Sequence, residues 1–120
     1  MIFNFTAHTR FYFYNEAVDM RKGIHSLYHL VKTAGNMDAL NGDGYVFIGR
    51  TRKTIKVLRW QNEGFVLYNK KLELGRYSLP QQVNEGVFFE VESCILDQII
   101  NSIKHKSSFN ELRLKAALTP

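Results

Sequence analysis

Residues 45–71 read YVFIGRTRKTIKVLRWQNEGFVLYNKK, and their pattern indicates how the central part of the chain folds. It holds three runs rich in β-branched and aromatic residues, which favour extended strands. Short polar turns, GRTRK and QNEG, separate the runs. Strands joined by such short turns pair in opposite directions. The stretch therefore predicts an antiparallel meander with strands at 45–48, 54–60 and 65–68, the last reaching as far as residue 71.

A strand and a helix are predicted before this meander. The aromatic run RFYFY at 10–14 is typical of a strand. A helix follows, with Asp19 as its N-cap. Its apolar residues share one helical face, and they are Met20, Ile24, Leu27, Tyr28, Val31 and Ala34. Gly35 and Asn36 end the helix, because the glycine can adopt the left-handed backbone conformation.

A strand and a helix are also predicted after the meander. Residues 86–91 form the strand, and Glu92 and Ser93 open the helix. The apolar stripe of this helix comprises Ile95, Leu96, Ile99, Ile100 and Ile103. We therefore predict an α+β fold, an antiparallel β-sheet meander with one helix before it and one helix after it. Residues 1–104 form the single α+β domain, and the weakly patterned residues 105–120 form a C-terminal tail.

The composition is that of a soluble domain in a reducing compartment. The 120 residues are 45% hydrophobic, enough for one packed core. Cys94 is the single cysteine, so it has no partner for an internal disulfide, and it is predicted to be buried and structural. No secretory signal and no run of about 20 apolar residues is evident. We expect a cytoplasmic protein that does not enter the membrane.

The excess positive charge lies in the centre of the chain. The net charge is +5, yet residues 50–76 hold eight basic and two acidic residues, which gives +6. Duplex DNA attracts such residues through its closely spaced phosphates. The eight candidate DNA-binding residues are Arg50, Arg52, Lys53, Lys56, Arg59, Lys70, Lys71 and Arg76. Arg21 and Lys22 join them as candidates, because they lie at the start of the first predicted helix and helix N-termini favour anions.

Two interpretations of the basic residues stay open in the sequence. A two-stranded ribbon can enter a major groove, where arginine can read guanine. The alternative is a solvated sheet face whose lysines prevent aggregation. Side chains alternate between the faces of a strand, so Lys56 and Arg59 should point in opposite directions. Convergence of the eight central residues on one face would favour DNA binding, and scatter would favour the solvated face.

Catalytic and metal chemistry are not favoured. His25 and His29 have the spacing of a helical metal pair, but no third ligand is evident nearby. Asp38, Asp43 and Glu63 lie in predicted turns, where such residues are common, and do not form the carboxylate cluster of a nuclease. We predict no catalytic residue, no metal site and no cofactor.

Aromatic residues alternate with the basic ones in the central stretch. Trp60 and Phe65 are predicted to lie in the core, whereas Tyr68 and Tyr77 stay undecided between core and surface. Exposed aromatic rings could stack on unpaired bases. A small RNA-binding domain is a weaker hypothesis, because the sequence carries no recognisable RNA-binding signature.

Residues 10–80 resemble a known family through an ordered set of short motifs. The matching motifs are Val18-Asp19-Met20-Arg21-Lys22, Val46-Phe47, Arg50, Arg52-Lys53, Ile55-Lys56-Val57-Leu58, Trp60, Gly64-Phe65, Lys70-Lys71-Leu72-Glu73 and Gly75-Arg76-Tyr77. This pattern is similar to that of the TnpB accessory proteins of the insertion-sequence family numbered sixty-six. Thr51 departs from the pattern where an arginine is usual, and Arg59 departs where a tyrosine is usual.

The resemblance implies a role in the transposition of a bacterial mobile element. Proteins of that family are encoded beside a separate transposase, which carries the catalytic residues. We therefore predict a non-catalytic accessory protein that binds DNA through its basic central hairpins and assists the transposase. The alternative is a protein-interaction module that docks the transposase without contacting DNA.

Overall fold

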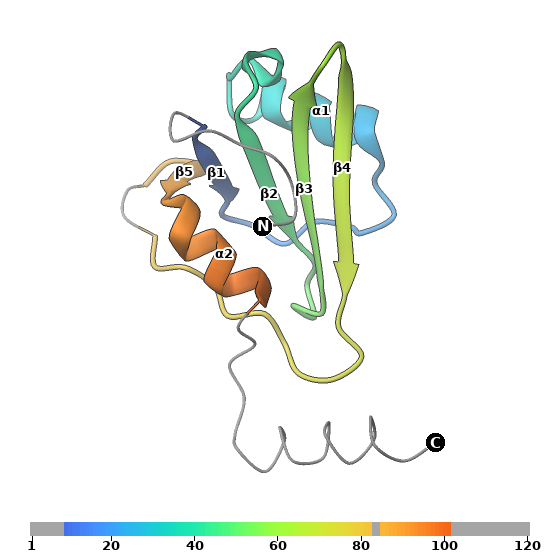
Figure 1. Cartoon of the computed structure of the whole chain (residues 1–120), viewed down its shortest axis with the longest axis vertical. Helices are drawn as coiled ribbons and strands as arrows, with labels where there is room; N and C mark the ends of the chain where they lie inside the picture. The colour runs from blue at the N-terminus through green and yellow to red at the C-terminus, as the bar shows by residue number, and fades with distance from the viewer. Residues whose placement is uncertain (1–8, 83–84, 102–120) are drawn as a thin grey trace.

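The computed structural model describes residues 9–82 and 85–101, which form a five-stranded sheet and two α-helices (Figure 1). The elements are β1 (Phe11–Tyr14), α1 (Ile24–Thr33), the 3₁₀ turn η1 (Ala39–Asn41), β2 (Gly44–Ile48), β3 (Thr54–Gln61), β4 (Gly64–Lys71), β5 (Phe88–Val91) and α2 (Ser93–Asn101). Each predicted strand and helix is present. No helix in these ranges is long and apolar enough to cross a membrane. The predicted domain limit at residue 104 and the tail at 105–120 lie outside the described residues.

The sheet is mixed, with the strand order β4-β3-β2-β1-β5. β2, β3 and β4 form the predicted antiparallel meander, in which Val57 lies between Val46 and Tyr68. β1 is antiparallel to β5 but parallel to β2, so the prediction of a purely antiparallel meander was wrong at this position. The physical reason is α1, which lies between β1 and β2 in the chain and forms the crossover that parallel strands require.

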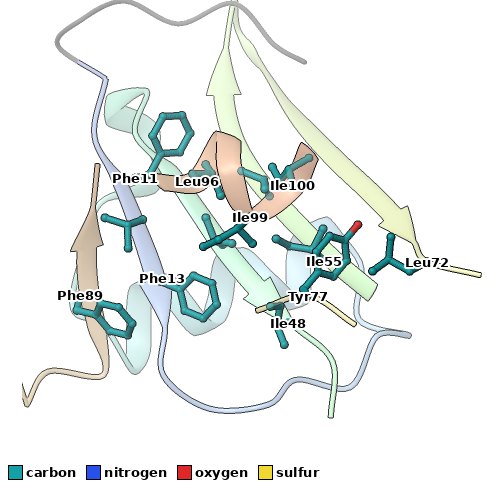
Figure 2. Close-up of a cluster of buried hydrophobic side chains, with 13 residues drawn as sticks. Phe11, Phe13, Ile48, Ile55, Leu72, Tyr77, Phe89, Leu96, Ile99 and Ile100 are labelled. Atoms are coloured by element: carbon teal, nitrogen blue, oxygen red, sulfur yellow. The ribbon is translucent and has the colours of Figure 1, made fainter. Parts of the chain in front are cut away.

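The two helices cover opposite faces of the sheet, so β2 is buried on both sides (Figure 1). On the α1 face, Leu27 and Val31 pack in one cluster with Tyr45 and Phe47. On the α2 face, a second cluster forms against Val46 and Ile48, the alternate residues of β2 (Figure 2). The helix contributes Leu96, Ile99 and Ile100 to this second cluster. Strand alternation thus supplies both cores from one apolar run.

The start of α1 differs from the prediction. The helix begins at Ile24 with Gly23 as its N-cap, and Asp19 lies in a turn before the helix. The Asp19 carboxylate accepts a hydrogen bond from the backbone N–H of Arg21 at 2.9 Å, so it stabilises that turn instead of the helix. Arg21 and Lys22 therefore precede the helix and do not form its N-terminal turn.

The residue that leaves the helical conformation after α1 also differs from the prediction. Asn36 adopts the left-handed conformation with φ +50°, and Gly35 does not have a positive φ. Gly35 instead permits a close approach, since a Cβ there would lie 2.6 Å from Cδ2 of Phe88. The glycine is required by packing against β5.

The predicted apolar stripe of α2 is confirmed at its centre. Leu96, Ile99 and Ile100 are buried, whereas Ile95 is 37% exposed and Ile103 lies outside the described residues. The prediction that Cys94 is buried was wrong, because its side chain is exposed on the first turn of α2.

Replacement of Gly44 by alanine should destabilise the fold. A Cβ at Gly44 would lie 2.4 Å from Cδ1 of Phe11, a fully buried ring of the α2-face cluster. Overpacking of this kind costs about 1–3 kcal/mol, so Gly44→Ala should lower the free energy of unfolding by about 2 kcal/mol in urea denaturation. Gly64→Ala is the matched control, because no atom lies within 4 Å of its Cβ. Equal stability of the two variants would contradict the close contact at Phe11.

Candidate nucleic-acid interface

A groove with four basic side chains lies at the end of the sheet where β2 turns into β3. Its volume is about 780 Å³, and three segments line it: residues 17–21, the turn at 49–54, and Lys71 at the end of β4. We call it the basic groove. Its four cationic side chains are those of Arg21, Arg50, Lys53 and Lys71.

Backbone and side-chain hydrogen bonds hold residues 17–22 against the sheet. The backbone N–H of Val18 donates to the carbonyl of Ile48 at 3.0 Å. The Lys56 ammonium group donates to the carbonyls of Met20 and Lys22 at 2.7 and 2.8 Å. These contacts place Arg21 on the wall of the groove that faces the β2–β3 turn.

The β2–β3 turn is held on its other side by the segment that follows β4. The backbone N–H of Leu72 donates to the carbonyl of Lys53, and that of Tyr77 donates to the carbonyl of Arg52, both at 2.7 Å. Arg52 has a φ of +61°, which lets the chain reverse direction within the turn. The turn is therefore embedded between two neighbouring segments.

One carboxylate lies among the basic side chains of the groove. Asp19 forms an ion pair with Arg21, with 2.6 Å between Oδ2 and Nη2, and it also accepts from Nε of the same guanidinium. The hydrogen bonds from Arg21 hold the pKa of Asp19 well below its ordinary value, so this carboxylate stays ionised at neutral pH. The Arg21 side chain is 92% exposed, so the pair lies in solvent.

The other three cations of the groove have no such partner. In the described part of the chain, no hydrogen bond or ion pair engages the side chains of Arg50, Lys53 and Lys71. Arg50 and Lys71 are exposed, and Lys53 is half-buried. Three positive charges are thus available for an anion that enters the groove.

Three of the ten predicted DNA-binding residues point elsewhere. Lys56 is 7% exposed, and its ammonium group is occupied by the two carbonyls at 20 and 22. Arg59 donates through Nε to the carbonyl of Gly42 at 2.9 Å, near the end of β3 that is farther from the groove. Burial lowers the pKa of the Arg59 guanidinium. Lys70 approaches the carbonyl of Ile100 at 3.4 Å on the α2 face. Convergence of all eight central residues on one face is therefore not found.

The remaining three candidates do not line the basic groove but belong to segments next to it. Lys22 is exposed and directly follows Arg21. Arg52 lines a smaller pocket that also contains Arg50. Arg76 is exposed beside Tyr77, which is bonded to the turn. The structure therefore brings together four of the ten predicted residues in the groove and places three on adjoining segments.

The aromatic residues of the central stretch lie away from the groove. Trp60 and Phe65 are half-buried and pack edge to face at the β3–β4 turn, at the opposite end of the sheet from the β2–β3 turn (Figure 1). Phe65 packs against the α1-face cluster, as predicted, whereas half-buried Trp60 belongs to neither cluster, so the prediction that it lies in the core was wrong. Tyr77 is 1% exposed, and Tyr68 packs against the α2-face cluster. The two undecided tyrosines thus contribute to the core, and neither lines the groove.

The described residues contain no candidate metal site around His25 and His29. His25 and His29 are both exposed on α1. No group of three histidine, cysteine or acidic side chains that could hold a metal ion occurs within residues 9–82 and 85–101.

Sequence reasoning missed one feature of the groove and one of its support. It did not place Asp19 among the basic residues, because only the folded chain brings residues 17–21 beside the turn. It also took Lys56 for a surface residue. The available signal was its position between Ile55 and Val57 in the middle strand of the predicted meander, where a lysine needs internal acceptors.

Comparisons with known proteins identify a family and two curated relatives. A protein-family model described as "IS66 Orf2 like protein" matches residues 9–108. Uncharacterized protein y4hO of Sinorhizobium fredii (strain NBRC 101917 / NGR234) is 31% identical over 85 residues, which span 71% of this chain and 72% of that protein. Uncharacterized protein y4jC of the same organism is 32% identical over 65 residues, 54% of this chain and 56% of that protein. No solved structure matches the chain.

Proposed function

Because the chain belongs to the IS66 Orf2-like family, we propose that it is a non-catalytic accessory protein of an insertion sequence. In this role it binds DNA through the basic groove and assists a separate transposase. The observation that carries the DNA-binding part is the basic groove itself. Arg50, Lys53 and Lys71 converge there from two segments of the chain without an internal partner in the described residues.

The groove suits an anionic polymer better than a small metabolite. It is open, its cations lie along its walls, and smaller side chains such as Ala17 and Thr51 complete its lining. Lysine and arginine side chains bind backbone phosphates and release the counterions condensed on DNA. Because one carboxylate remains in the groove, paired with Arg21, the proposed contact relies on the other three cations.

Fluorescence anisotropy with a labelled duplex tests the proposal. The full chain is titrated against a duplex that bears the element's terminal repeat, at a series of salt concentrations. We expect binding that weakens steeply with salt, as counterion release requires. Absence of binding at low salt would overturn the DNA-binding role, and capture of the transposase by the chain without DNA would then become the function to test.

Asp19→Asn is expected to strengthen DNA binding about tenfold near 0.1 M salt. The substitution removes the Asp19 carboxylate from the groove and releases the Arg21 guanidinium, which can then contact a phosphate. One more phosphate contact raises the affinity for DNA about tenfold at that salt concentration. The asparagine oxygen can still accept the backbone N–H of Arg21, so the turn is retained. The salt slope measured by anisotropy should become steeper by about one unit.

Glu63→Gln is the control for this prediction, because it removes the same charge from the exposed β3–β4 turn at the far end of the sheet. Screening over about 10 Å at 0.1 M salt should leave its affinity within about twofold of the unmodified chain. If both variants strengthened binding equally, net charge and not the groove would determine the affinity.

A further inference from the structure

We propose that the basic groove holds the sugar–phosphate backbone of DNA and does not read bases. This inference rests on the proposed function and specifies what the groove recognises. It is carried by three observations: the embedding of the β2–β3 turn, the chemistry of the groove lining, and the burial or distance of the described aromatic residues.

The β2–β3 turn cannot enter a major groove as a free two-stranded ribbon. Residues 17–20 adjoin it on one side through the Val18–Ile48 hydrogen bond, and residues 72–77 adjoin it on the other through the bonds to Arg52 and Lys53. Base edges lie at the floor of a major groove about 8.5 Å deep, where only a projecting element reaches them. The surface formed here is hollowed, with a volume of about 780 Å³, so it fits the outward ridge of the phosphate backbone.

The lining of the groove contains the groups that bind phosphate and few that select a base. The side chains of Thr51 and Thr54 add hydroxyl groups to the four cations, and no asparagine, glutamine or aromatic side chain takes part among the described residues. Of the two guanidinium groups in this lining, that of Arg21 is held by Asp19. The guanidinium of Arg50 is the one left to contact guanine, which makes Arg50 the residue to test.

Phe13 and Tyr14 line the smaller pocket that shares Arg50 with the basic groove, but these residues are only 4% and 8% exposed and so present little ring surface to a base. The Trp60–Phe65 pair, with ring centroids 4.9 Å apart, lies at the opposite end of the sheet (Figure 1). A base that leaves a strand bound in the groove would find no ring among the described lining residues on which to stack. Binding should therefore depend on the number of phosphates and little on the base sequence.

Competing duplexes test the inference. The chain is titrated with two duplexes of equal length and base composition, one with the terminal repeat and one with its order scrambled, across a salt series. We expect affinities within about threefold of each other and a salt slope of about −3, since each phosphate contact contributes about −0.9. A preference for the repeat of about 5- to 150-fold, the range for one bidentate base contact, would overturn the inference and leave the proposed function intact.

Arg50→Lys separates the two roles of this side chain. If Arg50 contacts phosphate alone, the lysine keeps the charge, and the affinity for both duplexes should stay within about threefold of the unmodified chain. Loss of affinity for the repeat alone would show that Arg50 reads a base and would overturn the inference. Failure of the unmodified chain to bind either duplex is a different result, because it overturns the proposed function and the inference with it.

Discussion

Replacing Arg50, Lys53 and Lys71 together by glutamine is expected to weaken duplex binding several-hundred-fold near 0.1 M salt. These side chains line the basic groove and have no partner in the described residues. Removing one phosphate-binding cation lowers the magnitude of the salt slope by about 0.9, which corresponds to nearly tenfold in affinity at 0.1 M. Anisotropy across a salt series gives both quantities, and the slope should fall close to zero.

The matched control removes three positive charges elsewhere. Arg10, Lys32 and Lys70 lie outside the groove, on the segment before β1, on α1 and on the α2 face of β4. Their joint replacement by glutamine leaves the groove intact, and screening limits its effect to a few-fold. Comparable weakening by the two triple variants would show that binding follows net charge and would contradict the basic groove as the contact surface. Circular dichroism should show both variants folded, because the six side chains are exposed or half-buried.

Lys56→Met is expected to lower the free energy of unfolding by about 2 kcal/mol. The methionine keeps nearly the same side-chain length but removes the ammonium group that donates to the carbonyls of Met20 and Lys22. Hydrogen bonds from a charged group contribute about 1.5–3 kcal/mol, and relief of the buried charge offsets part of the loss. Urea denaturation measures the change, and hydrogen exchange at residues 18–23 should become faster.

Lys71→Met is the control for the structural role of Lys56. Lys71 is an exposed lysine at the end of the neighbouring strand, so its replacement should change stability by less than about 0.5 kcal/mol. The two variants should also show that the stability of the fold and the affinity for DNA depend on different lysines. Lys71→Met removes a cation from the groove without unfolding, whereas Lys56→Met loosens the segment that carries Arg21. An Lys56→Met variant as stable as the unmodified chain would contradict the role assigned to the buried ammonium group.

Local patterns were sufficient to predict which elements form. The alternation in 45–71 predicted β2, β3 and β4 with their antiparallel pairing, and the apolar spacing predicted both helices. The parallel pairing of β1 with β2 was missed, because it depends on where the α1 crossover returns the chain. The start of α1 was missed because the Asp19 carboxylate accepts a hydrogen bond within its own turn. An aspartate can stabilise such a turn as readily as it caps a helix, so its presence alone does not mark where the helix begins.

The alternating strands, the two amphipathic helices and the concentration of positive charge in 50–76 are readable from residue order alone, because each follows from spacing along the chain. The sequence also carried the family resemblance, which the family model over residues 9–108 supports. Which basic residues share a surface depends on contacts between distant parts of the folded chain. Strand alternation sends Lys56 and Arg59 to opposite faces, as expected, and long-range hydrogen bonds place Arg21 beside Arg50 and Lys71. The bonds from Lys56 to the carbonyls of Met20 and Lys22 join residues 36 and 34 positions apart, a separation at which spacing along the chain carries no information about distance in space.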